Sequence, residues 1–215
     1  MSTYSYEVPV ARSTSRVLGM VLFLVAVAIG FAALGSVIGR DLEEGAARAC
    51  SFAGMGMLIV TWFVDAVRRG PLGIGWLFAL SLLIGLGLGP VIAYASEVDP
   101  GALTSAIGIT ALTVLGMGAI GFVLDKDLSG WMKPLSYIVL GAVVLSLGAL
   151  IFGGLGALSP FISLLILGAS ALLIMVDFNY VRKHATEDDV VWLATGIFVS
   201  ILNIFISLLN LFLGD

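Results

Sequence analysis

Seven long apolar segments, separated by short polar or turn-forming segments, make up most of this chain of 215 residues. Each reaches the length of about 20 residues that an α-helix needs to cross a hydrocarbon core of about 30 Å. The segments cover residues 17–38, 47–67, 72–94, 102–124, 132–152, 158–181 and 190–213. This pattern predicts an all-α integral membrane protein with seven transmembrane helices. We expect residues 1–16 to form a cytoplasmic N-terminal tail and residues 17–213 a single transmembrane domain.

The composition excludes several other classes. Hydrophobic residues make up 60% of the chain and charged residues 11%, whereas soluble domains are nearer half apolar and a quarter charged. The single cysteine, Cys50, excludes an internal disulfide, and the single histidine, His184, argues against a permanent metal centre. With a net charge of −4 and no cluster of Lys and Arg, the chain is not expected to bind nucleic acid.

No constellation of catalytic residues is recognisable in the apolar segments. An intramembrane serine protease would need a basic partner for its serine inside the membrane, but the only histidine lies in a polar segment. An aspartyl protease would need two buried acids that face each other, and the last apolar segment supplies none. We therefore expect no enzyme and no permanent cofactor or metal.

The distribution of basic residues predicts the orientation in the membrane. With the N-terminus in the cytoplasm, only Arg40 and Arg48 of the ten basic residues lie outside. The cytoplasmic ones are Arg12, Arg16, Arg68, Arg69, Lys126, Lys133, Arg182 and Lys183. This asymmetry follows the positive-inside bias of membrane proteins. We expect a plasma (inner) membrane protein whose N-terminus is cytoplasmic and whose C-terminus, Asp215, lies outside.

A stripe of small and polar residues runs along the last apolar segment. It consists of Gly196, Ser200, Asn203, Ser207, Asn210 and Gly214, which recur every three or four residues and so share one helix face. Two asparagines would be costly against lipid, so this face must look into protein or water. It is either a packing seam joined by hydrogen bonds or the lining of a polar path along a central helix.

Two acids, Asp65 and Asp177, interrupt apolar segments. Asp65 precedes Arg68 and Arg69 by three and four residues, the spacing of an ion pair on a helix. The nearest basic residues to Asp177, by contrast, are five and six positions away and off its own face. Asp177 is therefore either a structural hydrogen-bonding group near the interface or a functional acid of an ion pathway or a proton sensor.

The segment "VDFNYVRKHATEDDVVWLATGIFVSILNIFISLLNLF", residues 176–212, resembles the C-terminal signature of the Bax inhibitor family, especially its bacterial calcium-leak branch. The segments "KDLS" at 126–129 and "GLGLGPVI" at 85–92 support the resemblance. It implies a fold in which six helices surround a central seventh. It also implies a pH-sensitive Ca²⁺ leak controlled by two aspartates, one on the sixth helix and one on the seventh.

Asp177 occupies the first of these two positions, but Ser200 occupies the second. Because Ser200 does not ionise, a carboxylate pair that shares a proton cannot form here. The resemblance also implies an arginine as the partner of the first aspartate, a role that Arg68 or Arg69 could fill. We expect Asp177 to meet a polar group across helices, namely one of these arginines as a latch, Ser200 or Asn203, because an unpaired buried acid is costly.

Two functional hypotheses follow. The favoured one is a passive leak for Ca²⁺ or other cations, gated near Asp177 and modulated by pH, with Ser200 and Asn203 on the ion pathway. The alternative is a non-conducting membrane regulator that binds other membrane proteins, such as a quality-control protease. In both, the lipid bilayer is a partner of the chain, and Ca²⁺ is bound only transiently.

Overall fold

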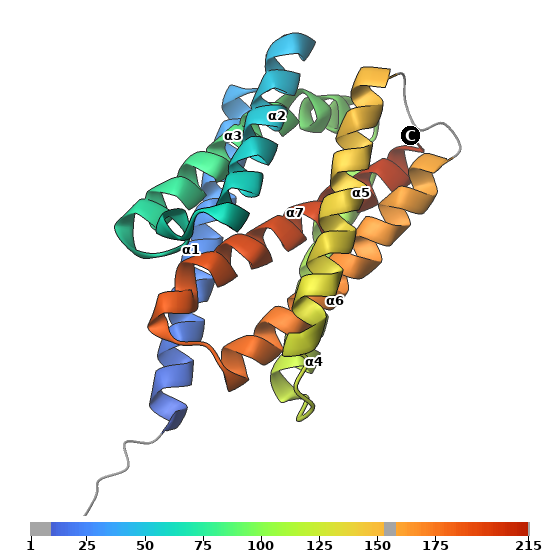
Figure 1. Ribbon diagram of the computed structural model, residues 1–215. Helices are drawn as coiled ribbons and strands as arrows, with labels where there is room; N and C mark the ends of the chain where they lie inside the picture. The colour runs from blue at the N-terminus through green and yellow to red at the C-terminus, as the bar shows by residue number, and fades with distance from the viewer. Residues whose placement is uncertain (1–9, 153–157, 215) are drawn as a thin grey trace, which may run out of the picture.

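Seven α-helices form the protein in the computed structural model, which describes residues 10–152 and 158–214 (Figure 1). They are α1 (Val10–Ile38), α2 (Glu44–Phe63), α3 (Gly70–Val98), α4 (Pro100–Val123), α5 (Met132–Phe152), α6 (Ser159–Lys183) and α7 (Val190–Leu213). Short 3₁₀ helices lie between them at Asp65–Arg68 (η1), Ser129–Trp131 (η2) and Glu187–Asp189 (η4). No strand occurs in the described residues, so the predicted all-α fold is confirmed.

The predicted boundaries hold to within a few residues except at two places. Helix α1 begins at Val10, so residues 10–16 of the predicted tail are helical, and residues 1–9 lie outside the described residues. Helix α2 ends at Phe63 because Val64 adopts an extended conformation, and η1 follows in place of the last predicted turn.

Among the described residues, six helices are long and apolar enough to cross a membrane: α1, α2, α3, α4, α6 and α7. Helix α5 has 21 residues, and the predicted span there includes residues whose side chains lie outside the described part of the structure. Large apolar side chains cover the outside of the bundle, where Leu112, Leu115 and Val123 of α4 are each at least 70% exposed. Contact with lipid explains such exposure, since water would penalise a continuous apolar surface of this kind.

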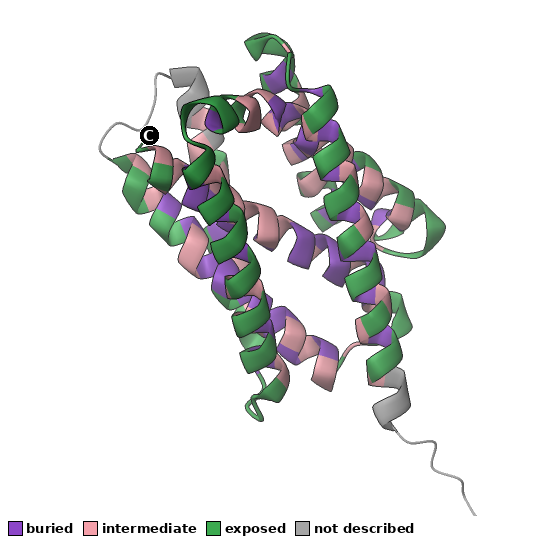
Figure 2. Cartoon of the chain, turned by 180° about the vertical axis from the view of Figure 1, so that it is seen from behind, coloured by how far each residue is buried: buried purple, intermediate pink, exposed green. Residues whose placement is uncertain are grey.

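Helix α7 runs through the middle of the bundle (Figure 1). It packs directly on α1, α3, α4 and α6, and it carries fully buried residues such as Leu193, Phe198 and Ile204. The other helices expose one face each, whereas α7 is largely buried or half-buried (Figure 2). The predicted arrangement of six helices around a central seventh is therefore present.

Glycines allow the close approach of α1 and α3. A Cβ atom at Gly85 of α3 would collide with the backbone of Ala32, and one at Gly35 of α1 would collide with the backbone of Leu82. Gly89 is in similar contact with the backbone of Gly39. The small-residue spacing along α3 thus marks a helix pair whose backbones touch, as is common in membranes.

The start of α1 and the connections α2–α3, α4–α5 and α6–α7 meet at one end of the bundle. Arg16 of α1 forms an ion pair with Glu187 of the α6–α7 connection, with 3.2 Å between Nη1 and Oε1. Trp62 at the end of α2 packs on Tyr137 near the start of α5, with ring centroids 5.1 Å apart. We call this the loop end of the bundle.

Candidate functional site

The polar stripe of α7 faces the interior of the protein. Ser200 and Ser207 are 3% and 2% exposed, and Asn203 is half-buried. Ser207 is enclosed by protein, and Ser200 and Asn203 line a cavity within the bundle. These three residues therefore look into protein or a cavity, as predicted. The reason is the cost of leaving hydroxyl and amide groups without partners in hydrocarbon.

A cavity of about 780 Å³ lies beside this stripe, between α2, α5, α6 and α7. Asp177 of α6 and Thr195, Ser200 and Asn203 of α7 form its inner wall. From Trp192, which also lines it, α7 rises by roughly 16 Å to Asn203 at about 1.5 Å per residue. The cavity therefore extends from the loop end to about the middle of a hydrocarbon core of about 30 Å.

Asp177 is almost completely buried, at 4% exposure. No hydrogen bond or ion pair joins its carboxyl group to any residue that the structure describes. Helix α7 passes close to it at Gly196, where a Cβ atom would lie 3.7 Å from Oδ2 of Asp177. Besides Asp177, the ionisable groups that line the cavity are Arg68, Lys133, Tyr137 and Tyr180.

The expected latch between Asp177 and an arginine is not formed in this structure. Arg68 lines the same cavity, but its Nη1 lies 3.3 Å from Oδ1 of Asp65, as the spacing of these two residues predicts. Its guanidinium group also lies over the ring of Trp192, 5.9 Å from the centroid. These contacts keep the charge near water at the loop end, where desolvation costs less than beside Asp177.

Of the other expected partners of Asp177, two line the cavity and one lies outside it. Ser200 and Asn203 line the same cavity as Asp177 but form no hydrogen bond with it. Arg69 does not line the cavity. The structure thus brings together Asp177, Ser200, Asn203 and Arg68 around one space and leaves Arg69 outside it.

Asn179 joins the end of α6 to the α4–α5 connection, a role that the sequence did not reveal. Its side chain is fully buried, and its Nδ2 lies 3.0–3.1 Å from the carbonyl oxygens of Gly121, Leu124 and Lys126. Its Oδ1 accepts a hydrogen bond of 2.9 Å from the backbone N–H of Leu128. The only sequence signal for this contact is an amide two residues after Asp177 in an otherwise apolar segment.

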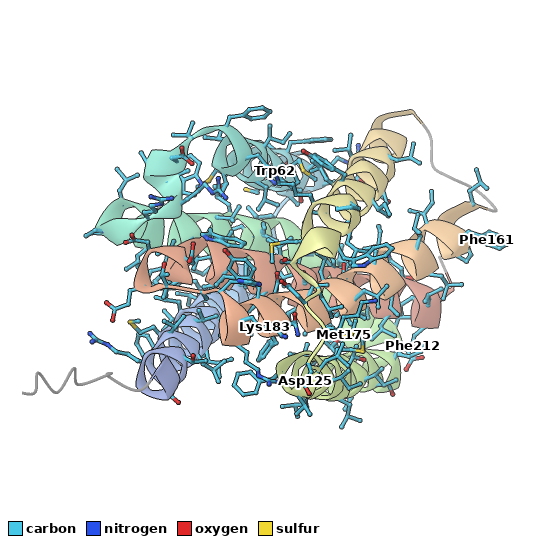
Figure 3. All side chains as sticks on the ribbon, turned by 60° about the horizontal axis from the view of Figure 1, so that its bottom comes forward. Trp62, Asp125, Phe161, Met175, Lys183 and Phe212 are labelled. Atoms are coloured by element: carbon cyan, nitrogen blue, oxygen red, sulfur yellow. The ribbon has the colours of Figure 1, made fainter. Side chains whose placement is uncertain are left out.

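The basic residues that follow Asn179 bind the same connection. Arg182 donates to the carbonyl oxygens of Phe122 and Val123 and to the carboxylate of Asp125, at 2.7, 2.8 and 3.0 Å. It thereby satisfies carbonyl groups in the last turn of α4, which have no partner within the helix. Lys183 donates to the backbone carbonyl of Asp125, and the two residues lie close together in Figure 3.

Asp127 and His184 form a further contact between the end of α6 and the α4–α5 connection. Nε2 of His184 lies 2.8 Å from Oδ2 of Asp127, and the backbone N–H of Ser129 donates to Oδ1 of the same carboxylate at 2.9 Å. The hydrogen bond from Ser129, followed by that with His184, lowers the pKa of Asp127 to about 2. The "RKH" segment therefore holds the α4–α5 connection against the end of α6.

Within the described residues, no group of three or more His, Cys, Asp or Glu side chains is placed to hold a metal ion.

Comparison with protein-family models gives a match over most of the chain. Residues 14–215 match the family model described as inhibitor of apoptosis-promoting Bax1. The match covers all seven helices except the first residues of α1. No curated protein matches the chain.

Proposed function

Because the chain belongs to the Bax inhibitor family, whose model covers residues 14–215, we propose that it is a passive leak for cations, with Ca²⁺ as the main one. It is a multi-pass membrane protein by its family and its apolar helices. In this proposal a cation enters the cavity from the loop end and meets the carboxylate of Asp177. The oxygens of Ser200 and Asn203 lie on its further path.

The observation that carries this proposal is the position of Asp177. It is the only acid among the residues that line the cavity, and within the described residues its carboxyl group has no partner. Carboxylate, hydroxyl and amide oxygens are the ligands that Ca²⁺ prefers. A structural acid would be expected to have a partner, because an unpaired buried charge is costly. An acid that binds a passing cation must have no permanent partner within the protein.

The conformation described here corresponds to a closed leak. On α7 the cavity ends at Asn203, and the buried side chains of Ile204, Leu208 and Leu209 follow. Two turns from Asp177 on the same face of α6, the hydroxyl of Ser170 is buried without a hydrogen-bond partner among the described residues. We propose that Ser170 and Ser207 become part of the path when the leak opens.

Ca²⁺ flux into liposomes that contain the purified protein tests the proposal. We expect flux above that of empty liposomes, with a rate that changes between pH 5 and pH 8. Asp177→Asn should remove at least half of this pH-dependent difference, because it removes the only acid on the cavity wall. The control is Glu97→Gln, which changes an exposed acid at the other end of α3 and should leave the profile unaltered. An unchanged profile in Asp177→Asn would make Asp177 a structural residue.

The alternative function, a non-conducting regulator that binds other membrane proteins, is favoured by two observations. The cavity does not cross the protein, and Ser200 stands where a second acid would make a pair. Flux equal to that of empty liposomes at every pH would support this alternative and reject the leak.

A further inference from the structure

The cavity has two unlike walls. The inner wall, on α6 and α7, carries the polar residues Asp177, Ser200 and Asn203, whereas the outer wall consists mainly of apolar side chains of α2 and α5. These apolar residues are Met55 and Leu58 of α2 and Val139, Leu140 and Val143 of α5. The outer wall is also incomplete, because α2 packs on α3 and α5 packs on α6, without extensive contact between α2 and α5 (Figures 1 and 2).

Two cations stand where this incomplete wall meets the loop end. Arg68 and Lys133 both line the cavity there. Lys133 is exposed and has no hydrogen-bond or ion-pair partner within the described residues. Within the described residues the ion-pair partner of Arg68 is Asp65, whose side chain is 85% exposed, and such a pair contributes little. The mouth of the cavity therefore offers positive charge to an anion.

Aromatic rings frame the same mouth. Trp62 and Tyr137, in contact across α2 and α5, are 40% and 59% exposed, and both line the cavity. Tryptophan and tyrosine are enriched where lipid headgroups meet the hydrocarbon core. The cavity thus combines headgroup-level aromatics, cations at the mouth and an apolar wall at the depth of acyl chains.

We propose that an acyl chain of an anionic phospholipid occupies the outer side of this cavity, between α2 and α5, with its phosphate group against Arg68 and Lys133. A volume of about 780 Å³ lies within the range of about 300–1,000 Å³ that is usual for ligand sites. Basic pockets between transmembrane helices are suited to anionic headgroups. The acyl chain completes the wall that α2 and α5 leave open. It separates the polar inner wall of the cavity from the bilayer.

Quenching of tryptophan fluorescence by brominated acyl chains tests this proposal. Trp192 is half-buried, lines the cavity and packs on Tyr180, so a chain in the cavity reaches it. In the single-tryptophan protein made by Trp62→Phe, Trp76→Phe and Trp131→Phe, brominated phosphatidylglycerol at about one-tenth of the lipid should quench Trp192 at least twofold more than brominated phosphatidylcholine at the same fraction.

Variants separate the proposed site from general contact with lipid. Lys133→Gln should reduce the quenching by phosphatidylglycerol to the level of phosphatidylcholine, because it removes the unpaired cation. Lys126→Gln, which changes an exposed lysine that does not line the cavity, should leave the preference unchanged. Val143→Phe fills the apolar side and should reduce quenching by both lipids. Size-exclusion profiles of the variants show whether each remains folded.

Equal quenching by the two lipids, or a preference that survives Lys133→Gln, would overturn the proposal. It goes beyond the proposed cation leak and does not depend on it, because the measurement detects a lipid and not an ion. A protein that conducts no Ca²⁺ can still show this quenching, and a conducting protein can lack it.

Discussion

Asp177 and Ser200 are the two residues that decide whether a pair of acids can form in the cavity, because Asp177 can ionise and Ser200 cannot. They line one cavity from neighbouring helices, and Gly196, one turn before Ser200, brings α7 close to Oδ2 of Asp177. A carboxylate at position 200 would therefore lie within the same small space as the first. Two acids so placed bind protons as a pair and not independently.

Ser200→Asp is accordingly expected to steepen the dependence of Ca²⁺ flux on pH, from a response to about one proton towards a response to about two. Ser200→Asn is the matched control, because asparagine has nearly the size of aspartate but does not ionise at these pH values. Flux measured in liposomes at small steps between pH 5 and pH 8 gives the slope. If the two variants have the same slope, the pair does not form.

At the scale of the helices, glycine contacts decide how closely α1 and α3 approach. Gly85→Ala places a Cβ atom against the backbone of Ala32, which cannot move aside as a flexible side chain can. We expect a loss of about 1–3 kcal/mol, as for other overpacked sites. Gly75→Ala, in the same helix but with nothing within 4 Å, should keep or raise the stability, since alanine favours a helix over glycine. Thermal unfolding of the two purified variants tests the difference.

The contact of α6 with the α4–α5 connection gives a second prediction at this scale. Asn179→Ala removes one acceptor and the donors for three carbonyl groups, and it leaves buried backbone groups without partners. We expect a loss of about 2–4 kcal/mol, because each unsatisfied buried group costs about 1–3 kcal/mol. Asn210→Ala on α7 is the control, because the side-chain amide of Asn210 forms no hydrogen bond within the described residues. A melting temperature of Asn179→Ala equal to that of the unchanged protein would contradict this role.

For the molecule as a whole, the open question is its direction in the membrane. The loop end carries Arg68, Lys126 and Arg182, so the positive-inside bias predicts that it faces the cytoplasm. In a Cys50→Ser background, a membrane-impermeant maleimide added to sealed right-side-out vesicles should label Glu97→Cys. Lys126→Cys should react only after the membrane is made permeable. The reverse labelling would show the opposite orientation and place the mouth of the cavity outside.

Local patterns were sufficient to predict the helices, their order and the inward-facing stripe of α7. A run of about 20 apolar residues must form a helix in lipid, because no other structure satisfies its backbone within one segment. The i, i+3 or i, i+4 spacing that placed Ser200, Asn203 and Ser207 on one face, and that paired Asp65 with Arg68, also acts within one helix. These properties depend on neighbours along the chain, so they are readable without a structure.

The cavity, the unpaired state of Asp177 and the contacts of Asn179 depend on how separate helices pack. Asn179 meets residues more than 50 positions away, and no periodicity along α6 indicates which carbonyl groups will lie opposite it. The cost of burying a charge led us to expect an ion pair between Asp177 and an arginine. Arg68 instead contacts Asp65 and Trp192, which lie nearer to water. Where a charge goes is a competition among partners from several helices, and the position of each partner follows from close packing of the whole bundle.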